Sequence, residues 1–312
     1  MKTVTSLPGG VLASPDTRRL ARWGVRATLA LALIGWLVWK GGWRGIGESL
    51  LAVSPGWFLL SLALYLAGQT LCAWKWGLLA GALGLRRSPA FYWVTYLGAM
   101  FPSLFLPTSV GGDIFRALAL GGSEDKQGAT VSVLADRGTG VLAMSWLAAL
   151  SVTLRPQGAF TAVLQGLSIA LTAGFLLPFA FRSAAPRNRF VARVLECWRQ
   201  PTLLLATVAM SLLFQLLVCG TYLVLGSALR LPVEPLFYLY LCPIVSVAAL
   251  SPITLNGLGE RVAALVLLLG LVGVGADQAV ALGLAWTGMV AAASLCGGVV
   301  LLCWGEQVGS RG

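Results

Sequence analysis

Long runs of apolar residues constrain the fold of this chain more than any other feature. About 20 apolar helical residues cross a bilayer core of about 30 Å. Hydrophobic residues make up 58% of the 312 residues and charged residues only 11%, against about 25% charged in soluble domains. The sequence therefore predicts an all-α polytopic membrane protein with six full transmembrane helices, at about 25–43, 57–82, 130–153, 159–181, 202–228 and 278–304.

Two further apolar regions, 91–120 and 234–275, are interrupted by polar residues. The first is broken by PTSVGGD at 107–113 and the second by PITLNGLGER at 252–261. The apolar pieces beside each break suit half-helices or re-entrant hairpins better than full spans. Irregular backbone at membrane depth is tolerated only where protein or a water-filled cavity surrounds it. We expect one broken segment in each half, either re-entrant or spanning.

An internal repeat relates the two halves. ALGLRRSPAFY at 82–92 resembles ALRLPVEPLFY at 228–238, and the pattern P-x4-G-x3-R occurs in both breaks. Doubled motifs of this kind point to a transport site between broken helices. The single span between the units makes their orientations opposite. We therefore expect one transmembrane domain over 25–304, with inverted repeat units at 57–153 and 202–304.

Basic residues orient the chain in the membrane. Most of the 22 Lys and Arg residues lie in one set of loops, and such loops face the cytoplasm. This predicts a bacterial inner-membrane protein with a cytoplasmic polar N-terminus (1–24) and a cytoplasmic tail (305–312). The loop 182–200 also carries an amphipathic pattern, which predicts a surface helix against anionic inner-leaflet lipid or ordinary positive-inside charge.

Composition argues against several function classes. The chain has no His and no Cys-x-x-Cys pair, and it has no nucleotide-binding motif or nucleophile elbow. We therefore expect no metal, no cofactor and no enzyme activity. The net charge of +11 lies in short loops, which is the membrane pattern and does not indicate a nucleic-acid partner.

Charges within apolar segments are costly, so each is a functional hypothesis. The sequence places Asp113 before Arg116, and it carries the adjacent pairs Asp136-Arg137 and Glu260-Arg261. Each acid can pair with its neighbouring arginine, and a structural ion pair is the alternative. Lys75, between Trp74 and Trp76, is interpreted as a snorkelling lysine at the cytoplasmic end of its span.

Glycines beside the arginines suggest how an anion is bound. Glycine permits the turn that a broken helix needs, and the N-terminus of the next half-helix favours a phosphate. Arg116 and Arg261 can add bidentate contacts, and close helix packing is the alternative role of the glycines. The candidate substrate-binding residues are Gly111, Gly112, Asp113, Arg116, Asp136, Arg137, Asn256, Gly257, Gly259, Glu260 and Arg261.

Four segments carry a resemblance to a known family. They read AWKWGLL at 73–79, PTSVGGDIFR at 107–116, ADRGTG at 135–140 and SPITLNGLGER at 251–261. Over about 20–304 the chain resembles the lysylphosphatidylglycerol synthase transmembrane-region family, the flippase-like module of the multiple peptide resistance factor. The resemblance implies a lipid-translocating membrane domain. Eight residues follow Trp304, so we expect no synthase domain, and lysylphosphatidylglycerol stays open as the substrate.

These observations favour a lipid flippase or transporter whose partner is a membrane lipid with an anionic phosphate. Two alternatives remain. One is an integral-membrane headgroup transferase, for which Asp113, Asp136 or Glu260 would serve as general base. The other is a non-transporting partner subunit.

The basic loop 182–200 provides a test of the topology. A reporter enzyme fused at Ala185 should behave as cytoplasmic, because arginine-rich loops are retained on that side. Periplasmic reporter activity would overturn the topology and, with it, the expected inversion.

Overall fold

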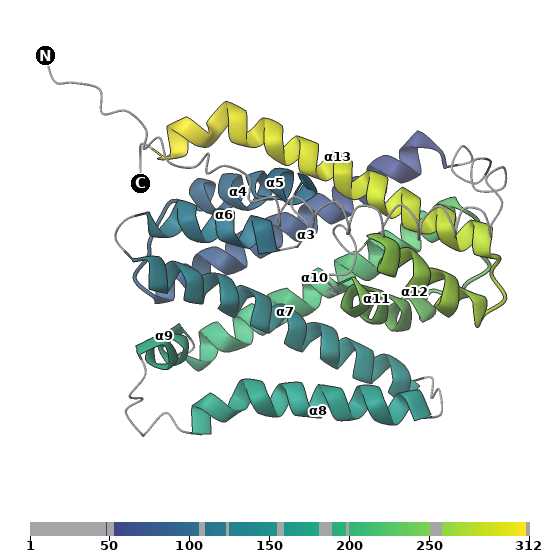
Figure 1. Cartoon of the computed structure of the whole chain (residues 1–312), viewed down its shortest axis with the longest axis horizontal. Helices are drawn as coiled ribbons and strands as arrows, with labels where there is room; N and C mark the ends of the chain where they lie inside the picture. Colours follow the sequence, from purple (N-terminus) through teal and green to yellow (C-terminus); the bar gives the residue numbers. More distant parts are fainter. Residues whose placement is uncertain are drawn as a thin grey trace, which may run out of the picture.

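The computed structural model describes residues 48, 53–105, 110–122, 125–154, 159–180, 189–197, 200–249 and 258–309. All regular secondary structure in these ranges is helical, which confirms the all-α fold class (Figure 1). The helices in chain order are α3 (Pro55–Ala82), α4 (Pro89–Gly98), α5 (Met100–Phe105), α6 (Val110–Gly121), α7 (Lys126–Leu154), α8 (Ala159–Ala180), α9 (Arg189–Cys197), α10 (Pro201–Ala228), α11 (Phe237–Ala248), α12 (Leu258–Gly270) and α13 (Ala276–Gly309).

Four helices are long and apolar enough to cross a membrane: α3, α7, α10 and α13. They coincide with four of the six predicted spans. The predicted span 159–181 is a single apolar helix, α8, and whether it crosses the bilayer stays a prediction. The predicted span 25–43 lies outside the described residues.

Short helices occupy the two predicted broken segments. Helices α4, α5 and α6 lie between α3 and α7 along the chain, and α11 and α12 lie between α10 and α13. The 12 residues of α6 rise about 18 Å, too little to cross a core of about 30 Å. Each half therefore has the same order: a long helix, short helices and a long helix.

The repeat is preserved in the turn that follows each first long helix. Both α3 and α10 have 28 residues and begin with proline in the first turn, where its missing N–H is harmless. Each is followed by a residue with positive φ, 81° at Gly84 and 53° at Arg230. The next residue donates a backbone hydrogen bond back into the helix, at 3.0 Å to Ala80 and 2.9 Å to Gly226. The same Schellman-type cap thus closes both helices.

The long helices run in opposite directions in the two halves. In Figure 1, α3 runs from right to left and α10 from left to right, and the two pack against each other. The short helices α4–α6 occupy the left of the bundle, and α11 and α12 occupy the right.

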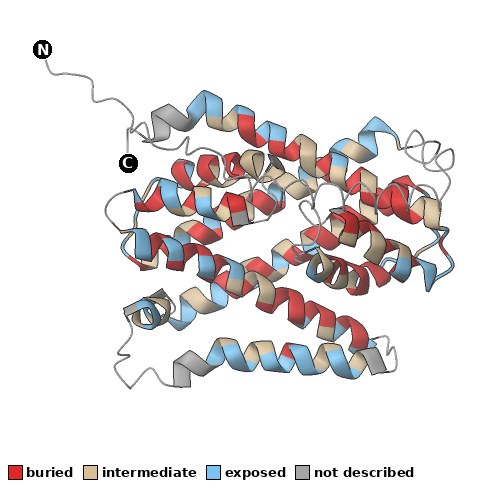
Figure 2. Cartoon of the chain, in the orientation of Figure 1, coloured by how far each residue is buried: buried red, intermediate tan, exposed pale blue. Residues whose placement is uncertain are grey.

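Buried residues form an inner core, and exposed residues lie on the outer faces of the helices (Figure 2). The largest core cluster gathers aromatic and aliphatic side chains of α7 and α10–α13, with Tyr222, Leu241 and Met289 fully enclosed. Large apolar residues also face outward, among them Val163 and Ile169 of α8 and Leu302 of α13. An apolar exterior of this kind marks a lipid-facing surface.

The predicted surface helix of the basic loop is present as α9. Its Arg193 pairs with Asp125 at 3.1 Å and donates to the carbonyl of Leu83 at 3.3 Å. Val194 packs against a cluster that includes Leu79 and Leu83. These contacts hold α9 against the ends of α3 and α7, and its contact with anionic lipid stays a prediction.

Helices α4 and α13 approach closely at Gly297, and this contact yields a prediction about stability. A Cβ at Gly297 would overlap the carbonyl oxygen of Leu97. Gly297→Ala should therefore destabilise the protein by about 1–3 kcal/mol, as overpacking does. Gly288→Ala is the matched control on α13, because a Cβ there meets nothing within 4 Å. Melting in detergent should separate the two variants, and equal melting temperatures would contradict this packing.

Candidate functional site

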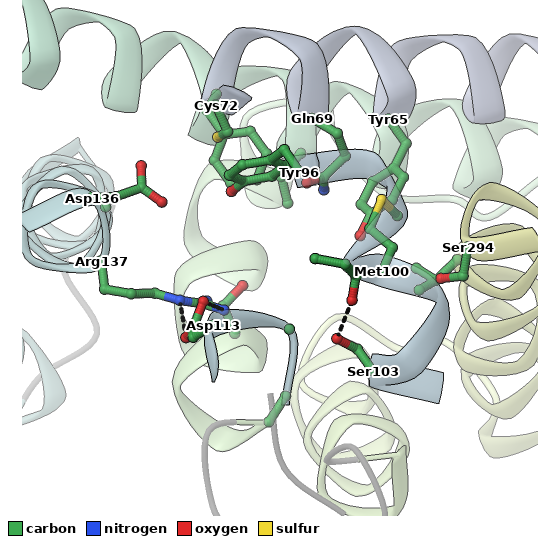
Figure 3. A pocket seen from close by; sticks show the side chains of 18 of the residues that line it. Tyr65, Gln69, Cys72, Tyr96, Met100, Ser103, Asp113, Asp136, Arg137 and Ser294 are labelled. Carbon is green, nitrogen blue, oxygen red and sulfur yellow. Dashed lines mark hydrogen bonds and ion pairs between the residues drawn. The ribbon is translucent and has the colours of Figure 1, made fainter. Parts of the chain in front are cut away.

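Both halves of the chain line one central cavity of about 350 Å³. This volume falls within the range of about 300–1,000 Å³ of small-molecule sites. Helices α3–α7 contribute from the first half and α10–α13 from the second. Figure 3 shows polar side chains on several sides of the cavity. The uncharged polar residues that line it are Tyr65, Gln69, Tyr96, Ser103, Gln215, Ser246 and Ser294.

A buried carboxylate, Asp136, joins two cations. Its Oδ1 lies 3.0 Å from Lys75 Nζ and its Oδ2 lies 2.9 Å from Arg116 Nη1, and all three side chains are 3% exposed. Lys75 also donates to the carbonyl of Asp136 at 3.0 Å, to Thr139 at 3.2 Å and to Ser211 at 2.9 Å. Burial of these charges is tolerable because each is paired and hydrogen-bonded.

A second carboxylate, Asp113, extends this network. Its Oδ1 lies 2.5 Å from Arg116 Nη2. Arg137 holds the same carboxylate from the other side, with Nε 2.9 Å from Oδ2 and Nη2 3.1 Å from Oδ1. Lys75, Asp136, Arg116, Asp113 and Arg137 thus alternate in charge and form what we call the ion-pair chain. The chain links α3, α6 and α7.

Arg116 is enclosed on all sides that the structure describes. Besides its two carboxylates, its guanidinium carbon lies 4.4 Å from the centre of the Tyr96 ring and 5.2 Å from that of Trp76. Cation–π contacts at these distances add to the ion pairs. Arg116 therefore has the environment of a structural residue.

Arg261, the equivalent arginine of the second half, has a different environment. It lines the cavity from the first turn of α12. Within the described residues it forms no ion pair or hydrogen bond, and its contact is with the Trp286 ring, 5.7 Å from the ring centre. Trp286 is fixed by parallel stacking on Tyr222 at 3.9 Å and an edge contact with Tyr65 at 5.7 Å. A half-buried guanidinium here faces a cavity and has no hydrogen-bond acceptor in the part of the chain that the structure describes.

The predicted site residues from the first half come together as expected, but their pairing differs from the prediction. Asp113 and Arg116 form the expected ion pair. Arg137 reaches Asp113 (Figure 3), whereas Asp136 pairs with Lys75 and Arg116. Adjacent residues on a helix point about 100° apart, so they rarely share a partner.

Among the predicted residues of the second half that the structure describes, Arg261 lines the cavity. Glu260 is not among the lining residues and does not pair with Arg261. Gly259 is buried in the first turn of α12. Asn256 and Gly257 lie outside the described residues.

The glycines of the first motif lie inside a helix. Gly111 and Gly112 are buried residues of the first turn of α6. A Cβ at Gly112 would lie 2.6 Å from Ser103 Oγ and 2.9 Å from the carbonyl oxygen of Ala99. The structure thus gives Gly112 a packing role, because a larger residue would push α6 away from α4 and α5.

The interpretation of Lys75 as a snorkelling interfacial lysine is wrong. Its side chain is buried in the ion-pair chain, and the adjacent Trp76 is fully enclosed and donates to Ser132 at 3.0 Å. The positions of Lys75 and Asp136 along their helices are the signal that could have predicted this ion pair. Lys75 lies about two turns from the end of α3 and Asp136 about three turns from the start of α7, and these ends lie on the same side of the bundle.

The ion-pair chain predicts unequal effects of two arginine substitutions. Arg116→Ala leaves the buried carboxylate of Asp136 and the 17% exposed carboxylate of Asp113 each short of a partner, so it should destabilise the protein by about 3–5 kcal/mol. Arg137→Ala should cost about 1 kcal/mol or less, because the Arg137 side chain is 49% exposed and exposed pairs contribute little. Thermal melting of the purified variants tests this. A larger loss for Arg137→Ala would refute the assigned order of the chain.

Comparison with known proteins gives one match. A family model described as "Lysylphosphatidylglycerol synthase TM region" matches residues 23–298. Comparisons with curated proteins and with solved structures found no match. The matched residues cover nearly all of the chain, including every helix that lines the cavity. The chain therefore belongs to the lysylphosphatidylglycerol synthase transmembrane-region family.

Proposed function

We propose that this protein is an integral-membrane lipid flippase or transporter that moves a phosphate-headgroup lipid across the bacterial inner membrane. One observation carries the proposal: a central cavity with excess positive charge lies among helices with an apolar exterior. Four basic and two acidic side chains line it, a net charge of +2. Charge at membrane depth is costly, and an anionic headgroup would balance this excess among the lining side chains.

The cavity separates the two chemical parts of a lipid. The headgroup would enter the cavity and meet Arg261, whose donors suit the oxygens of a phosphate. The acyl chains would remain in the bilayer, against exposed apolar side chains such as Ile169 and Leu302. The protein then needs no internal space for the chains.

The opposed directions of α3 and α10 support an inverted relation between the two units. We propose that α4–α6 form a re-entrant segment entered from the cytoplasm, and that α11 and α12 form its counterpart entered from outside. Inverted units with broken helices are a common basis for alternating access around a central site. The shared lining of the cavity fits this arrangement.

The charge distribution supports the proposed orientation. Arg86 and Arg87 follow α3, Lys126 begins α7 and Arg193 lies in α9. In Figure 1 the end of α3, the start of α7 and helix α9 all lie at the left. Since cytoplasmic ends are enriched in Lys and Arg, we place this end in the cytoplasm, with the N-terminal segment 1–24 and the tail 305–312. The basic face of α9 would then lie beside anionic inner-leaflet lipids.

The cavity favours transport over the two alternatives. A headgroup transferase needs an available general base, but Asp113 and Asp136 are both held by cations. Glu260 does not line the cavity. A non-transporting subunit would be favoured by a closed, dry midplane, which the charged cavity does not resemble.

Arg261 provides the test of this function. Arg261→Ala should slow translocation by about tenfold or more, because hydrogen bonds to charged groups contribute about 1.5–3 kcal/mol, while the melting temperature should change little. Arg261→Lys should restore transport poorly, since an ammonium cannot reproduce the guanidinium fork. The assay is bleaching by dithionite of fluorescent phosphatidylglycerol in proteoliposomes.

Arg230→Ala is the matched control for this assay. Arg230 is an exposed arginine of the same half that does not line the cavity, so its removal should leave the translocation rate unchanged. Full transport by Arg261→Ala would remove Arg261 from the site.

A further inference from the structure

We infer that a lipid with a zwitterionic headgroup that carries a primary ammonium binds in a second site, a groove between α3, α9 and α10. The groove has a volume of about 460 Å³ and shares no lining residue with the central cavity. In Figure 1 the end of α3, the start of α10 and helix α9 lie at the same end of the bundle. The groove residues are Gly77, Leu78, Gly81, Ala82, Arg86, Glu196, Gln200 and Leu203.

The wall of the groove is apolar and open. Leu78 of α3 is 46% exposed, and Leu203 lies across the groove in the first turn of α10. A Cβ at Gly81 would meet nothing within 4 Å, so the missing side chain leaves space beside Leu78, three residues earlier on the same helix face. Trp74, one turn before Leu78, is also exposed, and exposed tryptophans are typical of the membrane interface. An acyl chain would cover this wall.

The rim of the groove carries two opposite charges that do not pair with each other. Arg86, which follows α3, is exposed and forms no ion pair with any described residue. Glu196 of α9 is also exposed, and its Oε2 lies 3.9 Å from Nη1 of Arg193. Arg193 has a closer carboxylate partner, Asp125, at 3.1 Å. Both rim charges are therefore able to bind a ligand.

This arrangement of charges complements a zwitterionic phospholipid. The phosphate would accept hydrogen bonds from the guanidinium of Arg86, and the ammonium would donate to the carboxylate of Glu196. Phosphatidylethanolamine has such a headgroup. The choline of phosphatidylcholine has no N–H to donate, and phosphatidylglycerol has no cation to pair with Glu196. We therefore expect phosphatidylethanolamine to bind in the groove more tightly than either of the other two lipids.

Native mass spectrometry of the full-length purified protein provides the experiment. The protein is stripped of lipid by detergent and then titrated separately with phosphatidylethanolamine, phosphatidylcholine and phosphatidylglycerol. We expect phosphatidylethanolamine to bind about two- to fivefold more tightly than the others, which is the range that one exposed ion pair provides. Arg261→Ala alters the central cavity and should leave this binding unchanged, because Arg261 does not line the groove.

Filling the groove should remove the site. Gly81→Leu places an apolar side chain where the acyl chain would lie, so binding of phosphatidylethanolamine should weaken about fivefold or more. The melting temperature should not fall, because a Cβ there meets no atom within 4 Å and leucine favours a helix more than glycine does. Gly166→Leu on α8 is the matched control, since its Cβ also meets nothing within 4 Å and it does not line the groove.

Two rim substitutions test the headgroup separately. Glu196→Gln removes the partner of the ammonium, so the preference for phosphatidylethanolamine over phosphatidylglycerol should fall about two- to fivefold. Arg86→Ala removes the partner of the phosphate, which all three lipids share, and should weaken the binding of each. Both side chains are exposed, so the variants should melt like the wild type.

The outcomes decide the site and its ligand separately. Unchanged binding of phosphatidylethanolamine in Gly81→Leu and Arg86→Ala would overturn the groove as a lipid site. Tighter binding of phosphatidylglycerol, or a preference that survives unchanged in Glu196→Gln, would overturn the zwitterionic ligand. Either result would leave the proposed transport standing, because that function depends on the central cavity and is measured by translocation.

Discussion

The double ion pair of Asp136 is the interaction on which the rest of the site depends. Its carboxylate holds Lys75 of α3 and Arg116 of α6, and Lys75 also reaches Ser211 of α10. Helix α6 is too short to span the bilayer, so apolar contact with lipid cannot fix its depth. Ion pairs to two long helices can fix the depth of α6, because a charge that separates from its partner within the hydrocarbon has a high free-energy cost. The first turn of α6, with Gly112 and Asp113, is thereby held at the cavity.

The equivalent arginines of the two halves lie in different environments. Arg116 is enclosed by two carboxylates and two aromatic rings, whereas Arg261 faces the cavity from a stacked aromatic platform. This difference follows from one position in the repeat. Asp113 precedes Arg116 by three residues, and Leu258 stands at the corresponding place before Arg261. The first half thus supplies its own counter-ion, whereas Arg261 has none among the described residues and, in the proposed function, would bind the headgroup.

Sequence reasoning could predict properties that depend on length and order. The four long helices and the short helices at the two breaks follow from apolar run length and motif spacing. The repeated sequence at 82–92 and 228–238 contains the turns at Gly84 and Arg230, which the structure adds. Pairing could not be predicted, because it depends on the rotation of each helix about its axis. Asp136 therefore pairs with Lys75 and Arg116 rather than with Arg137. The tryptophans on either side of Lys75 led to its wrong interpretation as an interfacial residue. Uncharged lining residues such as Gln69 and Ser294 carried no signal, because polar residues of this kind occur throughout membrane helices.

A lipid flippase has to solve only part of the problem that a transporter of soluble molecules faces. The acyl chains of a lipid can remain in the bilayer, so the protein must lower the cost of moving only the headgroup through the hydrocarbon. A cavity of about 350 Å³ among four long helices is on the scale of a headgroup rather than a whole lipid. In the proposed function, excess positive charge in that cavity would replace the hydration that a phosphate loses when it leaves water. The same charge would also set a limit, since a headgroup that binds too tightly would not leave. Internal carboxylates keep the excess small, and Asp113, which lines the cavity and is held by two arginines, would compete with a bound headgroup for Arg137.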